Sequence, residues 1–154
     1  MSISQSDKAR RFLELHVPGR PLLMPNPWDP GSAKVLAASG FEALATTSMG
    51  YAFSLGKLDT TVGRDEMLAH LASLAAATSL PVNADLENGY GDDPHTVAET
   101  IRLAAAARLL DELVIIAPAG DDGAAQALAA EVGAAITTVA GPTGIPDAFA
   151  AVLG

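Results

Sequence analysis

Short apolar segments alternate with longer amphipathic segments along this chain, and this alternation constrains the fold more than any other feature of the sequence. The short segments are nearly continuous runs of apolar residues closed by Gly, Pro, Asn or Asp, which is typical of buried strands in a parallel sheet. The segments expected as strands are 21–24, 41–47, 80–85, 113–117 and 135–140. The segments expected as helices are 4–15, 29–40, 64–78, 93–109, 124–132 and 146–152, and a loop is expected over 48–63. The order predicts an α/β fold in which one helix is followed by about five βα units.

The length of the chain leaves two architectures open. A complete (β/α)8 barrel needs typically about 250 residues, and this chain has 154. We therefore expect residues 1–154 to form a single α/β domain. It is either an open, doubly wound parallel sheet or a partial TIM-type (β/α)8 barrel with about five strands. In both architectures ligands bind at the carboxyl ends of the strands, so the candidate functional residues are those that directly follow each strand.

The charge of the chain limits its partners. It contains 9 Lys and Arg residues against 18 Asp and Glu residues, which gives a formal net charge of −9. Nucleic acids and anionic membrane surfaces repel such a protein, so neither is expected as a partner. The absence of cysteine excludes thiolate nucleophiles and Cys-ligated metals and fits a cytoplasmic location. No run of about 18 apolar residues and no signal peptide is recognisable.

Two carboxylates stand at the end of one expected strand. Asp85 and Glu87 are separated by a single residue, so their side chains point to the same side of the sheet. Hard oxygen ligands of this kind suit Mg²⁺, which usually takes one or two carboxylates and keeps several waters. The spacing alone fits equally simple alternatives, in which the two acids cap the following loop or face solvent.

A second candidate follows the strand expected over 41–47. Ser48, Met49 and Gly50 form a turn whose backbone N–H groups could hold an anion, or an ordinary connection between strand and helix. Ser48 lacks the flanking glycines of a nucleophile elbow, so it is not expected to act as a nucleophile. Trp28, at the end of the first expected strand, either walls a pocket or simply packs. No histidine shares metal-ligand spacing with another, so none is expected to be catalytic.

Three separate stretches of this sequence resemble a known family. They are MPNPWDPGSAKVLAASGFEALATTSMGYAFSLGKLD at 24–59, RDEML at 64–68 and LPVNADLENGYGD at 80–92. In this order and at these distances they resemble the isocitrate lyase/phosphoenolpyruvate mutase superfamily, most closely its phosphonomutase-like or 2-methylisocitrate-lyase-like branch. The resemblance runs from about residue 21 to residue 108.

The resemblance implies a fold, a chemistry and a set of roles. The family folds as a (β/α)8 barrel and forms homo-oligomers. It binds Mg²⁺ (or Mn²⁺) with a small anionic 2-oxo or enol acid, and makes or breaks C–C or P–C bonds through an enolate-like intermediate. By motif, Asp85 corresponds to the main metal-binding acid and Glu87 to a second acid that acts through water. Ser48, Met49 and Gly50 correspond to the turn that holds the substrate carboxylate, and Asp59 to a catalytic acid on a mobile loop that closes over the site.

The chain also departs from the family. Three family motifs do not occur after Arg108: a strand with a Ser-Ile-Glu-Asp-like ending, the catalytic loop, and an Asn/Thr-Ala-Arg-like motif. Residues 113–144 resemble later units of the family instead. Roughly two central units are thus missing. Three hypotheses remain: an Mg²⁺-dependent lyase or phosphonomutase, a shortened non-catalytic relative that keeps ligand or metal binding, and an open-sheet flavodoxin-like binding domain without metal. The acids at the strand ends favour the first two, and the missing units favour the second for this chain taken alone.

Overall fold

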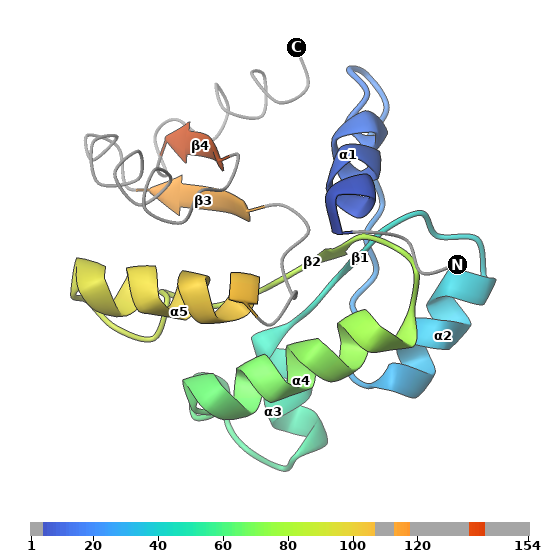
Figure 1. The fold of residues 1–154 in the computed structure, drawn as a ribbon. Helices are drawn as coiled ribbons and strands as arrows, with labels where there is room; N and C mark the ends of the chain where they lie inside the picture. Colours follow the sequence, from blue (N-terminus) through green and yellow to red (C-terminus); the bar gives the residue numbers. More distant parts are fainter. Residues whose placement is uncertain (1–4, 107–112, 118–135, 141–154) are drawn as a thin grey trace.

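The computed structural model describes residues 5–106, 113–117 and 136–140. In this part of the chain one or two helices precede each of the strands β1, β2 and β3 (Figure 1). The elements are α1 (Gln5–Leu15), α2 (Pro30–Ala38), β1 (Leu44–Ala45), α3 (Ser48–Ser54), α4 (Arg64–Ala77), β2 (Val82–Asn83), α5 (Pro94–Ala106), β3 (Leu113–Ala117) and β4 (Ile136–Ala140). The helices expected over 124–132 and 146–152 lie outside the described residues.

The strands form two parallel pairs. β1 pairs with β2 in a register that places Leu44 opposite Val82, and β3 pairs with β4 from Leu113 opposite Ile136 onward. The predicted class, α/β with parallel strands, is therefore confirmed. The single sheet of about five strands is not found within the described residues, where the strands are divided between two two-stranded sheets.

The strand expected over 21–24 was wrong. Contact with β1 comes after this segment, where Ala45 N donates to Pro25 O at 3.1 Å. Prolines at positions 21, 25 and 27 have no N–H to donate to a neighbouring strand, so the segment cannot complete a ladder.

The loop expected over 48–63 was also wrong in its first half, because residues 48–54 form the helix α3. Thr47 caps this helix, since its Oγ1 accepts a hydrogen bond from Gly50 N at 3.2 Å. Ala52 is fully buried against Val62 and Met67, so tertiary packing supports the helix. Glycine and serine residues suggested a loop, but a cap and a buried face outweigh their low helix propensity.

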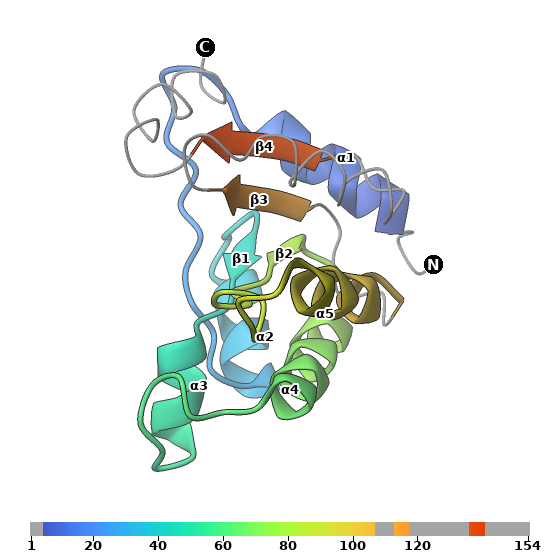
Figure 2. The same ribbon diagram turned by 90° about the vertical axis from the view of Figure 1, so that its left-hand side faces the viewer.

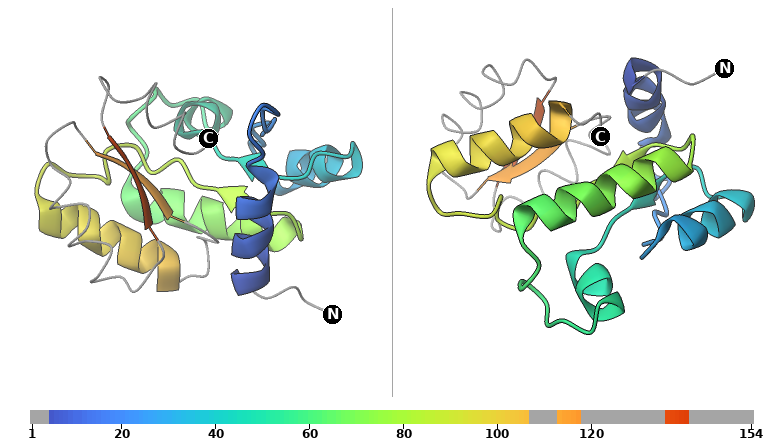
Figure 3. Two further views of the ribbon diagram at one scale, coloured as in Figure 1. Left: turned by 90° about the horizontal axis from the view of Figure 1, so that it is seen from above. Right: turned by 60° about the horizontal axis from the view of Figure 1, so that its bottom comes forward.

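The core lies between the β1–β2 pair and the helices that cover it. Leu44 and Val82 of the strands pack with Ala33 of α2 and Leu74 of α4. Burying a side chain such as leucine stabilises a fold by roughly 1.5–3 kcal/mol. α4 also lies beside α5 (Figure 3). α1 lies on the opposite side of the β1–β2 pair from α4 (Figures 1 and 2). α4 therefore packs against α2, α5 and the β1–β2 pair.

Within the described ranges, none of the helices has the length and apolar character needed to cross a lipid bilayer.

Candidate functional site

The carboxyl ends of β1 and β2 bring two of the predicted site residues into contact. Ser48 follows β1 and Asp85 follows β2. The backbone N and the Oγ of Ser48 each donate a hydrogen bond to Oδ2 of Asp85, both at 2.9 Å. The two residues therefore lie together at one rim of the β1–β2 pair, the end at which both strands finish.

The backbone of Asp85 is fixed by a residue that the sequence analysis missed. Thr46 is buried, and its Oγ1 accepts a hydrogen bond from Asp85 N at 2.8 Å. Thr46 N in turn donates to Asn83 O at 2.9 Å, which continues the pairing of the two strands. The sequence signal that could have identified Thr46 is a hydroxyl side chain directly after a buried strand. Asp85 is thus held both at its main chain and at its carboxylate.

The loop after β2 adopts an unusual backbone conformation. Glu87 and Tyr90 have positive φ values of 52° and 66°, and Gly89 has φ 79°. Such values cost a non-glycine residue about 1–2 kcal/mol and persist only where the surroundings impose them. Asp85 Oδ1 accepts from Glu87 N at 3.1 Å, and the buried Thr100 Oγ1 donates to Gly89 O at 2.7 Å. These bonds hold Glu87 beside Asp85.

The charges of two aspartates act on Glu87 at this rim. The pKa of Glu87 is raised by its burial first, then by the charges of Asp85 and Asp59. The pKa of the Tyr90 hydroxyl is raised by burial and then by the charges of Glu87 and Asp85. Asp59 is exposed, and its Oδ1 accepts from Thr60 N at 3.0 Å. Asp59 therefore influences the site through its charge, while its own hydrogen bond lies within its loop.

The donor set fits a divalent cation. Carboxylates that crowd together raise one another's pKa, and a cation between them removes that repulsion. Within the described part of the chain, no three His, Asp or Glu side chains come close enough to hold a metal ion by themselves. A cation here would thus have one or two carboxylate ligands, with water in the remaining positions. This is the coordination that Mg²⁺ prefers in proteins.

The turn expected to hold a carboxylate is already engaged within the protein. Ser48 N donates to Asp85, and Gly50 N donates to Thr47 Oγ1. Met49 is half exposed beside them. A ligand carboxylate would therefore have to replace an internal hydrogen bond of Ser48 or accept one from the backbone N–H of Met49. The carboxylate-binding role of these three residues stays a prediction.

α3 and α4 carry an aromatic pair that the sequence did not reveal, of which His70 is buried and Tyr51 is partly buried. The rings of Tyr51 and His70 are stacked, with centroids 3.6 Å apart and planes at 8°. His70 Nε2 and Tyr90 Oη are buried and have no hydrogen-bond partner among the described residues. Burial lowers the pKa of His70, an effect that the charge of Asp29 partly opposes. The stacking of His70 on Tyr51 therefore joins α4 to α3.

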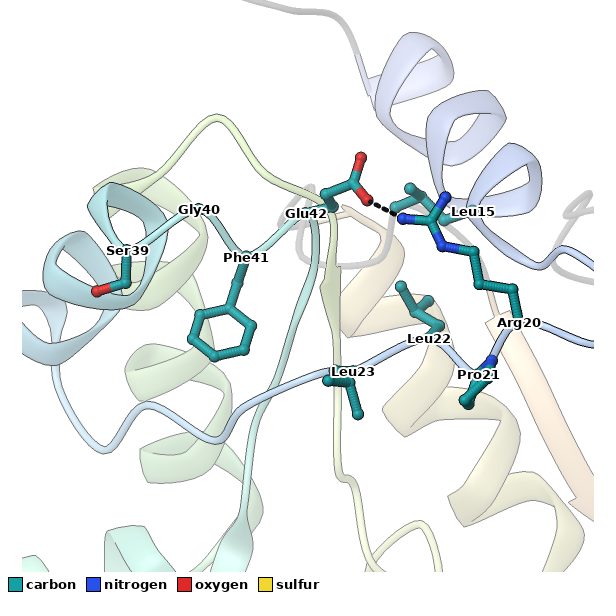
Figure 4. A pocket seen from close by; sticks show the side chains of 9 residues that line it. All are labelled: Leu15, Arg20, Pro21, Leu22, Leu23, Ser39, Gly40, Phe41 and Glu42. Atoms are coloured by element: carbon teal, nitrogen blue, oxygen red, sulfur yellow. Dashed lines mark hydrogen bonds and ion pairs between the residues drawn. The ribbon is translucent and has the colours of Figure 1, made fainter.

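A cavity of about 330 Å³ lies elsewhere in the molecule (Figure 4). Phe41 and Glu42, which line it, precede β1, so the cavity lies at the amino end of that strand and not near Ser48 and Asp85. The Arg20 side chain reaches across it to Glu42, at 3.4 Å. The chemistry-bearing side chains and this cavity occupy opposite ends of the strand.

Comparison with known proteins places this geometry in a family. The family model for phosphoenolpyruvate phosphomutase matches residues 12–112. The solved structure of a candidate lyase/mutase from Burkholderia cenocepacia J2315 matches with a TM-score of 0.66 and 51% identity, over 83% of this chain and 47% of that chain. The structure of 2,3-dimethylmalate lyase matches with a TM-score of 0.69 and 26% identity, over 90% of this chain and 52% of that chain.

A curated relative from Mycobacterium tuberculosis, an uncharacterised protein, is 37% identical over 90 residues, which are 58% of this chain and 35% of that protein. The chain thus spans about half of these solved structures and about a third of this curated relative. Its parallel strands and helices match part of the TIM-barrel structures of one superfamily. Because the family model covers more than half of the sequence, the chain belongs to the phosphoenolpyruvate phosphomutase family, within the PEP mutase/isocitrate lyase superfamily.

Proposed function

We propose that the Ser48–Asp85 rim binds a small 2-oxo or enol acid together with Mg²⁺ or Mn²⁺, as part of a partial (β/α)8 barrel. The whole protein's reaction is then cleavage or formation of a C–C or P–C bond in that acid. The observation that carries the proposal is the pair of 2.9 Å hydrogen bonds from Ser48 to Asp85. They join the turn proposed for the substrate to the acid proposed for the metal.

Each predicted residue has a distinct role in this proposal. Asp85 holds the cation directly, and Glu87 holds it through water. A bound divalent cation supplies electrostatic stabilisation to the negative charge that develops on the substrate oxygen. Ser48, Met49 and Gly50 orient the substrate carboxylate, and a residue that fixes orientation in this way contributes strongly to rate. Asp59, on the loop after α3, closes over the substrate and excludes water.

Metal binding provides the direct test. Calorimetric titration with Mg²⁺ should give a weak but measurable affinity for the wild-type chain. Asp85→Ala should abolish the binding and Glu87→Ala should weaken it several-fold, because charge-assisted contacts are lost. The matched control is Asp65→Ala, which removes an exposed acid at the start of α4. Equal affinities in the wild type and Asp85→Ala would refute the assignment.

For this chain taken alone, a second candidate function is ligand and metal binding without turnover. The coverage of the solved relatives, 47% and 52%, favours it. Positioned groups account for factors of about 10² or more each, so a site that lacks several of them falls near the background rate. Assays with 2-methylisocitrate, oxaloacetate and phosphonopyruvate separate the two candidates. Turnover of any of these at an ordinary enzymatic rate would exclude the non-catalytic alternative.

A further inference from the structure

We propose that Trp28 forms an aromatic wall of the candidate site and contacts the carbon skeleton of the bound acid, which makes it a specificity-determining residue. The inference rests on the proposed function, because it takes the ligand to lie beside Ser48 and Asp85. It goes further by naming the residue that selects an organic acid with an apolar substituent.

The position of Trp28 is fixed by the segment around it. Asn26 Nδ2 donates to Ala45 O at 2.8 Å, which ties this segment to β1. Trp28 N donates to Ser32 Oγ at 3.0 Å, in the first turn of α2. Because these bonds attach the segment to the end of β1 and to the start of α2, Trp28 stands at the strand end where Ser48 also lies.

The indole of Trp28 rests directly on Gly50. A Cβ atom added to Gly50 would lie 2.6 Å from the indole Nε1 and 2.8 Å from Cδ1, closer than real Cβ atoms approach other atoms. The same added Cβ would also lie 2.6 Å from Thr47 Cγ2. Glycine at position 50 is therefore what allows the ring to reach the backbone of α3, within one helical turn of Ser48.

The rest of the ring has no cover in the described structure. Trp28 is 50% exposed, and no described residue accepts a hydrogen bond from its Nε1. Met49, the neighbour of Gly50, is 48% exposed. Tryptophan at a binding surface contributes a large apolar area together with a polar N–H group.

The site thus has two chemically different sides. Asp85 and Glu87 supply the acidic side, which suits a cation and the oxygen atoms that the cation holds. Trp28 and Met49 supply an apolar side, which suits carbon and not oxygen. A ligand that satisfies both sides carries a carboxylate at one end and an apolar group at the other, as 2-oxobutyrate does and oxalate does not.

The test compares these two ligands by calorimetry in the presence of saturating Mg²⁺. Trp28→Ala should weaken 2-oxobutyrate binding about tenfold, while oxalate binding changes less than about twofold. Trp28→Phe keeps an aromatic ring and should stay within about threefold of the wild type for both ligands. A merely structural role would weaken both ligands together, so equal losses in Trp28→Ala would overturn the inference.

A second readout does not depend on any Trp28 variant. The sequence contains a single tryptophan, so fluorescence excited selectively from tryptophan, and not from the two tyrosines, reports on residue 28 alone. Saturating 2-oxobutyrate should change this emission in the wild type and leave it unchanged in Asp85→Ala. Binding by calorimetry without any change of emission would overturn the role of Trp28 while leaving the proposed function intact. Failure of the wild type to bind either ligand would instead overturn the proposed function, and this inference with it.

Discussion

Asp85 is the residue with the most hydrogen bonds at the candidate site. Its carboxylate accepts from Ser48 N, Ser48 Oγ and Glu87 N, and its own N–H donates to Thr46 Oγ1. A carboxylate held by several donors has a fixed direction, which is what a ligand to a cation requires. The sequence identified Asp85 and Ser48 by their places after strands. It did not identify Thr46, because a threonine in an apolar run looks like an ordinary strand residue.

Replacing Thr46 by valine tests this support. Valine has nearly the same shape, so the change removes the acceptor of Asp85 N and leaves a partly buried N–H without this partner. We expect a loss of about 1–3 kcal/mol in the free energy of unfolding, measured by urea denaturation. Thr46→Ser keeps the hydroxyl and should recover most of the hydrogen-bond energy. If Thr46→Val is as stable as the wild type, this hydrogen bond does not stabilise the fold.

The buried His70 predicts a dependence of stability on pH. Its pKa in the folded chain lies below the ordinary value of 6.5, so in the window between the two values the unfolded chain binds a proton that the folded chain does not. The contribution of neutral His70 to the free energy of unfolding is therefore fully present above about pH 6.5, and it is lost as the pH drops through that window. Asp29, whose charge acts on His70, limits the size of the effect.

Urea denaturation of the wild type and of His70→Phe between pH 7.5 and 5.5 measures this contribution. Phenylalanine preserves a ring that can stack on Tyr51 but does not titrate. The midpoint of the wild type should fall more steeply with decreasing pH than that of the variant. Parallel curves for the two proteins would contradict the expected role of His70.

At the scale of elements, α4 follows the sequence pattern closely and α3 does not. The apolar residues of α4 recur at helical spacing, and the structure buries Met67, Leu71 and Leu74 as that spacing predicts. α3 depends on the cap from Thr47 and on the burial of Ala52, and the second of these is a contact that local sequence does not reveal. The prediction of a strand over 21–24 was wrong for a different reason. Its apolar residues fit a strand, but the prolines in and beside it cannot donate to a neighbouring strand.

Leu74 gives the sharpest test of the packing of α4. It is fully buried against Leu44, Val82 and Ala33, so truncation leaves a cavity between the helix and both strands. Leu74→Ala should lower the free energy of unfolding by about 2–5 kcal/mol. Leu58 is 76% exposed, and Leu58→Ala should change it by less than about 0.5 kcal/mol. Similar losses in the two variants would contradict the described packing.

At the scale of the whole molecule, the sequence predicted the class of fold and the rim on which the polar residues gather. It could not predict how few residues of β1 and β2 would pair, because pairing depends on neighbours distant in sequence. The roles of Asp59, Met49 and Glu87 stay predictions for the same reason. They depend on a ligand and on the conformation of loops, and neither of these follows from the order of residues.

The two-stranded β1–β2 pair predicts how the chain behaves in solution. Strands with unpaired edges tend to associate with other strands, and isolated two-stranded sheets are marginally stable. We expect size-exclusion chromatography with light scattering to give an assembly larger than the 15.6 kDa of one chain. A monodisperse monomer at micromolar concentration would contradict this expectation.

The hydrogen bonds between Ser48 and Asp85 join residues that lie 37 positions apart in sequence. They exist only when β1 and β2 are paired, so the site and the sheet form in the same event. Any ligand that prefers the joined geometry must then raise the melting temperature of the strand pair, by thermodynamic linkage. At a concentration one hundred times its dissociation constant, such a ligand adds about 2.7 kcal/mol to the free energy of unfolding. Occupancy of the rim thereby favours the folded form of the chain, in addition to any chemistry performed there.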